Sequence, residues 1–139
     1  MKKIISFFAI AFSFLTLSAC AAPAAAAAPT PTATPAEYRK ISAKDAKARM
    51  DSGDEIIILD VRTQKEFDAG HIKGAILVPN ETIIDKQPKL LPDLDAEILV
   101  YCRSGNRSAQ AAKKLIAIGY TNVVDFGGIM DWPYDVVTY

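Results

Sequence analysis

The residue in this sequence that is best placed for covalent chemistry is Cys102, which stands where an apolar run gives way to a polar loop. The run at residues 98–101 is typical of a buried strand, and a strongly helical stretch at residues 109–116 follows the loop. The first N–H groups of a helix lack internal partners, and the helix dipole adds about half a positive charge at that end. A thiol in such a field ionises more readily than a free cysteine. We therefore interpret Cys102 as a nucleophile rather than an inert structural thiol.

The loop that follows Cys102 carries groups suited to binding an anion. Arg103 and Arg107 flank the thiol, and we expect their guanidinium groups to attract an anionic substrate and to stabilise the charge on its departing part. Gly105 permits a tight turn, through which the amides of residues 103–108 can converge on an anionic sulfur atom. The candidate substrate-binding residues are Arg103, Ser104, Gly105, Asn106, Arg107 and Ser108.

The composition of the chain limits what else it can be. Its 139 residues suffice for one domain, and 16 basic against 16 acidic residues give no bulk attraction to nucleic acid. The two cysteines, Cys20 and Cys102, each have a separate explanation, so we expect no disulfide between them. With one histidine and no cysteines at metal-ligand spacing, the sequence predicts neither a metal site nor a cofactor. We expect a monomer that binds no nucleic acid.

The start of the chain is typical of a secretory signal peptide. Residues 1–19 have a basic beginning and an apolar run that is too short to span a bilayer comfortably. The segment leads into Leu-Ser-Ala-Cys at residues 17–20, which resembles the bacterial lipobox. That resemblance implies cleavage before Cys20 and a lipid on its sulfur, and so an anchor on the extracytoplasmic side of a membrane of the cell envelope. The alternative is an ordinary secreted protein that is cut after another small residue.

The next segment predicts a tether. Residues 20–36 hold the candidate lipidated cysteine and then mainly Ala, Pro and Thr, with prolines too frequent for a stable helix and no side chain large enough for a core. Only the segment that follows, residues 37–139, has the composition of a folded domain.

Strand and helix signals alternate along residues 37–139. Apolar runs predict strands at residues 38–41, 55–61, 75–78, 97–101 and 121–125. Capping residues and glycines predict helices at residues 42–53, 63–70, 107–118 and, in part, 81–91, with a short terminal helix after Gly128. Repeated strand–helix units predict an α/β fold, with a small parallel sheet of about five strands covered by helices on both faces. The functional site of such a sheet lies at the carboxyl ends of its strands, where Cys102 is placed.

Four segments, in order and at matching spacing, resemble the single-domain rhodanese family of sulfurtransferases. They are Leu59-Asp60-Val61-Arg62 with Glu66-Phe67, Gly70-His71-Ile72-Lys73-Gly74-Ala75, the loop from Cys102 to Ser108, and Gly127-Gly128 with Trp132. The resemblance implies a rhodanese-like fold and a catalytic Cys102 that takes a sulfane sulfur from an anionic donor such as thiosulfate. It also implies that the resulting persulfide passes this sulfur to a thiophilic acceptor, either cyanide or a thiol.

Two other functions remain open from the sequence. Cysteine phosphatases and arsenate reductases of the cell-cycle phosphatase type resemble rhodaneses, but their loop has five residues between cysteine and arginine. Here four residues separate Cys102 from Arg107, and the shorter ring suits one sulfur atom better than a tetrahedral oxyanion. The second alternative is a module without catalytic activity that senses sulfide or docks another protein.

Several polar residues near the strand ends are interpreted as structural. Arg62 follows a strand and lies close in sequence to Asp60 and Glu66, so an ion pair with one of these carboxylates is expected. His71 belongs to a turn that is mainly structural in the rhodanese family. With Cys20 lipidated, Cys102 has no resolving cysteine in the chain, so its sulfur chemistry needs an external acceptor.

Overall fold

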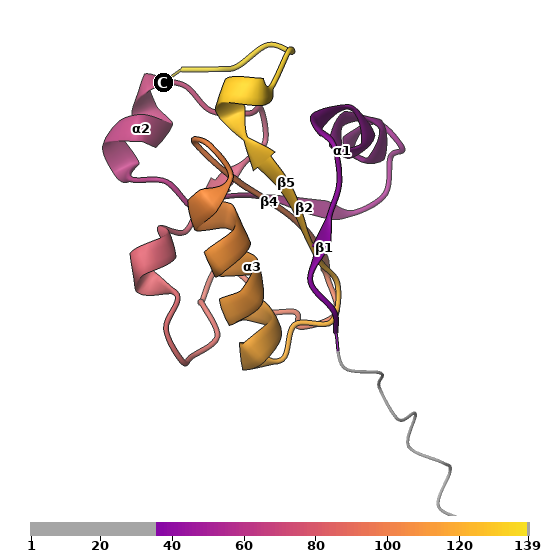
Figure 1. The fold of residues 1–139 in the computed structure, drawn as a ribbon, viewed down its shortest axis with the longest axis vertical. Coiled ribbons are helices and arrows are strands. Elements are labelled where there is room, and N and C mark those ends of the chain that lie inside the picture. Colours follow the sequence, from indigo (N-terminus) through magenta and orange to yellow (C-terminus); the bar gives the residue numbers. More distant parts are fainter. Residues whose placement is uncertain (1–35, 139) are drawn as a thin grey trace, which may run out of the picture. The chain divides into compact units, whose positions relative to one another are not determined.

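The fold is built on a parallel sheet of five strands, which confirms the predicted fold class (Figure 1). The computed structural model describes residues 36–138, so the predicted signal peptide, Cys20 and nearly all of the predicted tether lie outside the described residues. Across the sheet the strands are β1 (Arg39–Lys40), β5 (Val123–Gly128), β4 (Glu97–Cys102), β2 (Ile56–Asp60) and β3 (Ile76–Leu77). All of these neighbours pair in parallel. The strand that ends in Cys102 is therefore the central one.

Helices cover both faces of this sheet. They are α1 (Ala43–Met50), α2 (Gln64–Ala69) and α3 (Asn106–Ile118). Two short 3₁₀ turns, η1 (Asn80–Thr82) and η2 (Ile129–Asp131), follow β3 and β5. In Figure 1 the indigo α1 and the orange α3 lie on opposite sides of the strands. None of the helices within residues 36–138 is long and apolar enough to cross a membrane.

The predicted caps of α1 and α2 are present. The Ser42 side chain accepts a hydrogen bond from the backbone N–H of Asp45. At the start of α2, Thr63 and Glu66 form the complete capping box, in which each side chain bonds the other residue's backbone N–H. These local bonds fix where each helix begins.

Two apolar clusters, one on each face of the sheet, join the layers. Ile98, Val100 and Cys102 of β4 belong to the cluster that includes the buried side of α3. Leu99 and Tyr101 belong to the other cluster, which includes the buried side of α1. This division follows from the alternation of side chains along a strand. Cys102 consequently faces α3.

The helix predicted in part over residues 81–91 is reduced to the 3₁₀ turn η1. The rest of that segment runs as a loop, and Pro88, which lacks an N–H donor, limits any helix there.

The buried face of α3 is rotated from the predicted one. Helical spacing of the apolar residues predicts that Ala109, Ala112, Leu115 and Ile116 share the buried face, whereas Ser108, Ala111, Ala112 and Leu115 are the buried residues. The physical reason is a hydrogen bond from the Ser108 hydroxyl to the Gly127 carbonyl, which draws this polar residue against β5.

β5 reaches Gly128, three residues beyond the predicted end of that strand. This extension brings the Gly127-Gly128 pair into the sheet beside the end of β4, where Cys102 pairs with Gly128. This difference in the boundary of β5 bears directly on the candidate site.

The expected ion pair of Arg62 is confirmed, and its partner is Asp60. Both side chains are buried, and Arg62 Nη2 lies 2.6 Å from Asp60 Oδ2 and 2.7 Å from the Gly70 carbonyl oxygen. His71 is also buried, with its Nδ1 2.9 Å from the Phe67 carbonyl oxygen and its ring stacked on Phe67. These contacts tie the end of β2 to α2 and the turn behind it.

Candidate active site

Cys102 occupies the last position of the central strand, at the carboxyl edge of the sheet. Only 1% of the residue is exposed, so its sulfur atom is covered by the loop that follows. It is the one free cysteine among residues 36–138. A buried thiol at the point where a strand meets a helix start matches the expected place of the nucleophile.

Gly105 turns the loop so that a backbone amide meets the sulfur. Its φ of 98° lies in the left-handed region that favours glycine, and it is the N-cap of α3. Its N–H donates a hydrogen bond to Cys102 Sγ across 3.1 Å. Among the described residues no other amide makes this bond with Sγ, whereas the sequence predicted several converging amides. The N-terminus of a 13-residue helix therefore lies beside the thiol and favours negative charge there.

Ser108 braces the loop from inside. It is fully buried, and its hydroxyl lies 3.0 Å from the Gly105 carbonyl oxygen and 3.2 Å from the Gly127 carbonyl oxygen, either of which can accept its proton. Its oxygen also lies 3.7 Å from Cys102 Sγ and can accept a hydrogen bond from the thiol. Ser108 thus connects the thiol, the turn and the end of β5.

The loop after Cys102 packs directly against Gly127 and Gly128 at the end of β5. A Cβ atom on Gly128 would lie 2.3 Å from the Arg103 carbonyl oxygen and 2.6 Å from the Ser104 Cα atom, distances that no side chain tolerates. A Cβ atom on Gly105 would lie 3.4 Å from the Gly127 Cα atom. The two backbones are therefore in direct contact, which explains why glycines stand at these positions.

Arg107 has a partner that the sequence did not indicate. Its guanidinium donates to both carboxylate oxygens of Glu66, at 2.8 and 2.7 Å. The pKa of Glu66 is lowered to about 2, mainly by its hydrogen bonds from Arg107 and to a smaller extent by those from Thr63. The capping-box pattern predicted only the local role of Glu66, because no sequence signal connects it with a residue 41 positions away.

The three remaining predicted loop residues lie at the surface. Arg103 is exposed, and within residues 36–138 it forms no ion pair, so no carboxylate there compensates its charge. Ser104 is also exposed. Asn106 starts α3 and accepts a hydrogen bond from the side chain of Gln110. The side chains of Arg103, Ser104 and Asn106 therefore lie at the surface of the loop, away from the buried thiol.

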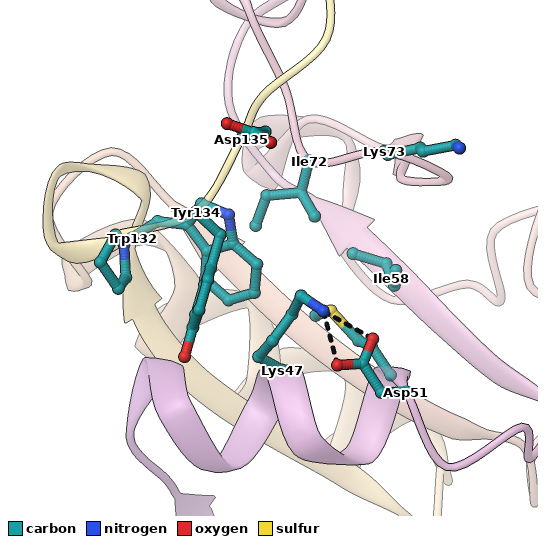
Figure 2. A pocket seen from close by; sticks show the side chains of 10 residues that line it. Lys47, Asp51, Ile58, Ile72, Lys73, Trp132, Tyr134 and Asp135 are labelled. Carbon is teal, nitrogen blue, oxygen red and sulfur yellow. Dashed lines mark hydrogen bonds and ion pairs between the residues drawn. The ribbon is translucent and has the colours of Figure 1, made fainter.

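A separate pocket of about 530 Å³ lies at the other face of the sheet (Figure 2). Figure 2 shows Lys47 of α1 and Asp51, the residue that follows α1, facing each other, and their side chains form an ion pair. The Lys47 ammonium group lies 5.5 Å from the centre of the Tyr134 ring. The pocket is lined by neither Cys102 nor any residue of its loop. Within residues 36–138 no group of three or more His, Cys, Asp or Glu residues could hold a metal ion. The candidate nucleophile, Cys102, therefore lies outside this pocket.

A known protein family matches most of the described chain, including the Cys102 loop. The Rhodanese-like domain family matches residues 42–133, a range that includes β2, β4, α3 and most of the loops between them. The chain belongs to the rhodanese-like family. The resemblance carried by the four sequence segments is thereby confirmed.

Several curated relatives are sulfurtransferases. The thiosulfate sulfurtransferase GlpE of Pseudomonas fluorescens is 36% identical over 93 residues, which cover 67% of this chain and 82% of the relative. The thiosulfate sulfurtransferase PspE of Escherichia coli is 34% identical over 73 residues, which cover 52% of this chain and 70% of the relative. The adenylyltransferase and sulfurtransferase UBA4 of Candida albicans is 40% identical over 104 residues, but the chain spans only 24% of that protein's length. The family and these relatives support sulfurtransferase activity in general.

Solved structures share the architecture. The rhodanese-like domain of Alr3790 from Anabaena has a TM-score of 0.65 and 26% identity, covering 74% of this chain and 81% of that one. A rhodanese with anions from E. coli has a TM-score of 0.55 and 30% identity, covering 61% of this chain and 100% of that one. The central parallel sheet with flanking helices is thus the rhodanese-like fold.

The contact between Gly128 and the loop predicts that Gly128→Ala displaces the loop. The backbone of Gly128 is extended, with φ −117°, so alanine meets no torsional strain there and acts only through its clash with Arg103 and Ser104. We expect sulfurtransferase activity to fall by about tenfold or more, because small misplacements of reacting groups cost that much. Steady-state assays of the folded variant measure this.

The control is Gly53→Ala, at the amino end of β2. Gly53 has a φ of 82°, and apart from its chain neighbours no residue has an atom within 4 Å of the place that a Cβ atom would take, so the change strains the backbone without touching the loop. It should lower thermal stability and leave activity within about twofold of the unmodified chain. Equal activity losses in the two variants would contradict the account.

The Glu66–Arg107 pair predicts a specific pH dependence of stability. The pKa of Glu66 is about 2 in the folded chain and 4.5 without its partners, so the pair stabilises fully above pH 4.5 and this contribution is lost as the pH falls towards 2. Glu66→Gln keeps the capping box but removes the charge. The difference in unfolding midpoint between the unmodified chain and Glu66→Gln should shrink over that interval. The matched control is Glu55→Gln, a change of an exposed glutamate outside the pair, which should show no such change. A difference in unfolding midpoint between the unmodified chain and Glu66→Gln that stays constant between pH 4.5 and pH 2 would count against the pair.

Proposed function

We propose that the chain transfers a sulfane sulfur from thiosulfate, or a related anionic donor, to a thiophilic acceptor through a persulfide on Cys102. The observation that carries this proposal is the hydrogen bond from the Gly105 N–H to Cys102 Sγ at the N-terminus of α3. That arrangement favours a negatively charged sulfur without a full counter-charge. Membership of the family and similarity to two thiosulfate sulfurtransferases point in the same direction.

The transfer divides into two displacements at sulfur. In the first, the Cys102 thiolate, which has lost its proton to solvent, attacks the outer sulfur of thiosulfate. A bond forms between the two sulfur atoms, the original sulfur–sulfur bond of thiosulfate breaks, and sulfite leaves with the bonding electron pair. In the second, cyanide or a thiolate attacks the outer sulfur of the persulfide, and Cys102 departs as a thiolate. No external oxidant or reductant is needed.

The charges around the loop support an anionic donor. Arg107 is compensated by Glu66, whereas Arg103 is exposed and has no ion pair within residues 36–138, so Arg103 supplies positive charge beside the loop. The helix N-terminus adds a partial positive charge on the same side. A related rhodanese of E. coli has been solved with anions, which agrees with an anion-binding loop of this kind. We assign Arg103, Ser104, Gly105, Asn106, Arg107 and Ser108 to the surroundings of the substrate.

The proposal predicts that Cys102→Ser abolishes thiocyanate formation from thiosulfate and cyanide, because a serine hydroxyl neither ionises near neutral pH nor carries sulfane sulfur. The matched control is Cys20→Ser, which removes the other cysteine and should retain the rate. Thermal unfolding of both variants checks that the fold persists. Undiminished activity of Cys102→Ser would sink the mechanism. An unmodified chain that instead hydrolyses an aryl phosphate or reduces arsenate would point to oxyanion chemistry, and one with none of these activities to a sensing or docking module.

We further propose that Cys20 is lipidated and that the domain is held at the extracytoplasmic side of a membrane of the cell envelope. What supports this proposal is the sequence Leu-Ser-Ala-Cys after a short apolar run, followed by the Ala/Pro/Thr-rich residues 21–36. A diacylglyceryl group on one cysteine supplies the two chains that stable anchoring requires. We propose a monomer that depends on small-molecule donors and acceptors.

Lipidation predicts a covalent label. Bacteria that express the full chain and are fed labelled palmitate should incorporate label into it, and the chain should sediment with membranes. In Cys20→Ala both the label and the sedimentation should be lost, since the acceptor sulfur is gone. Label that persists in Cys20→Ala, or an unmodified chain without any label, would overturn the assignment.

A further inference from the structure

The register between β4 and β5 shifts immediately beside the nucleophile. Cys102 pairs with Gly128, whereas two positions earlier Val100 pairs with Asp125, so β5 holds one residue more than β4 over this stretch. An extra residue of this kind is typical of a β-bulge, which leaves a ladder group unpaired and re-aims the chain next to functional sites. Gly127, with a φ of 93°, lies in the bulge.

The N–H group of Gly127 is taken up by a buried side chain instead of by the sheet. Asp125 has no exposed surface, and its Oδ1 accepts the Gly127 N–H across 2.9 Å. Its Oδ2 accepts a hydrogen bond from the Tyr38 hydroxyl across 2.7 Å. A buried carboxyl group costs stability unless such bonds are made, and here each oxygen has a donor. The side chain of Asp125 therefore sets the shape of the bulge.

Tyr38 keeps its donor role over the whole range in which proteins operate. Burial, together with the hydrogen bond to Asp125 and the nearby Asp125 charge, raises the pKa of Tyr38 to about 12. The ammonium group of Lys113 from α3 lies over the Tyr38 ring, 5.4 Å from its centre, a cation–π contact that favours this position of the ring. The phenol thus remains protonated and fixed against Asp125.

The bulge contacts two residues of the loop around the thiol, Ser108 and Gly105. The Gly127 carbonyl accepts from the Ser108 hydroxyl, whose oxygen lies 3.7 Å from Cys102 Sγ. Gly105, whose N–H bonds Sγ, approaches Gly127 so closely that a Cβ atom would lie 3.4 Å from the Gly127 Cα atom. A shift of Gly127 must therefore move both groups that contact the sulfur.

We propose that Asp125 and Tyr38 are positioning residues for sulfur transfer, which hold the bulge at Gly127 so that Ser108 and the Gly105 amide stay aligned with Cys102. The proposal rests on the proposed role of Cys102 as sulfur carrier. Tyr38 lies ahead of residues 42–133, the range that matches the family, and 87 positions from Asp125. The segment that leads into the domain thereby takes part in shaping a site built at the far end of the chain.

The test uses three variants of the full chain. Tyr38→Phe removes only the hydroxyl and should lower the kcat of sulfur transfer by about fivefold, the effect of one hydrogen bond, with the KM for thiosulfate within about twofold. Asp125→Ala removes both acceptors and should lower kcat further. Asp125→Asn should restore most of the rate, because an amide oxygen can still accept from Gly127 and its NH₂ group can donate to the Tyr38 oxygen.

Tyr120→Phe is the matched control. Tyr120 is a buried tyrosine of the same apolar cluster as Cys102, and its hydroxyl donates to the Leu91 carbonyl across 2.6 Å. Its loss should lower the thermal unfolding midpoint much as the loss of the Tyr38 hydroxyl does, yet leave kcat unchanged. An equal fall of kcat in Tyr120→Phe would show that general stability, not positioning, decides the rate.

A second readout separates this proposal from the proposed function. The backbone amide NMR signals of Gly105 and Gly127 should shift in Tyr38→Phe and remain in place in Tyr120→Phe, whether or not the chain transfers sulfur. Unmoved signals together with an unchanged kcat in Tyr38→Phe would overturn the positioning role, even if Asp125→Ala fails to fold. If the unmodified chain forms no persulfide but the Gly105 and Gly127 signals shift in Tyr38→Phe as expected, only the proposed function is overturned. Tyr38 and Asp125 would then position the loop for another reaction.

Discussion

The arrangement around Cys102 depends on a contact between two stretches of backbone. The loop after the thiol lies directly on the end of β5, at a distance that leaves no room for a side chain on Gly128. That contact holds the turn at Gly105, and the turn directs its N–H toward Sγ. The buried Ser108 hydroxyl then connects both stretches from inside. The backbone contact and the Ser108 hydrogen bonds therefore set the position of the loop relative to Cys102.

Electrostatics refine this geometry. The N-terminus of α3 supplies partial positive charge without a side chain, which suits a large, weakly hydrated sulfur anion. Of the two arginines in the loop, Arg107 is engaged by Glu66 and links α2 to α3, while Arg103 lies exposed at the surface. One arginine is thus compensated by a carboxylate within the fold. Under the proposed function, the other leaves its positive charge free for an anionic donor.

Much of the fold, and the position of Cys102 at the end of the central strand, follow from local sequence signals. Apolar runs such as residues 98–101, the Thr63–Glu66 capping box and the glycine at position 105 each report on their own surroundings, and these predictions agree with the structure. The bond between Glu66 and Arg107 and the role of Asp125 join residues far apart in the chain, and no local pattern encodes them. The extension of β5 was missed because two consecutive glycines are typical of a turn, and only the bulge accommodates them in a strand.

The most direct test of the account is the intact mass of the chain after incubation with thiosulfate and then with cyanide. The account predicts a gain of one sulfur atom, located on Cys102 by peptide mapping, and its removal by cyanide with return to the starting mass. A mass that stays unchanged under an excess of donor, or an added sulfur on a residue other than Cys102, would contradict the central claim that this thiol carries the sulfur.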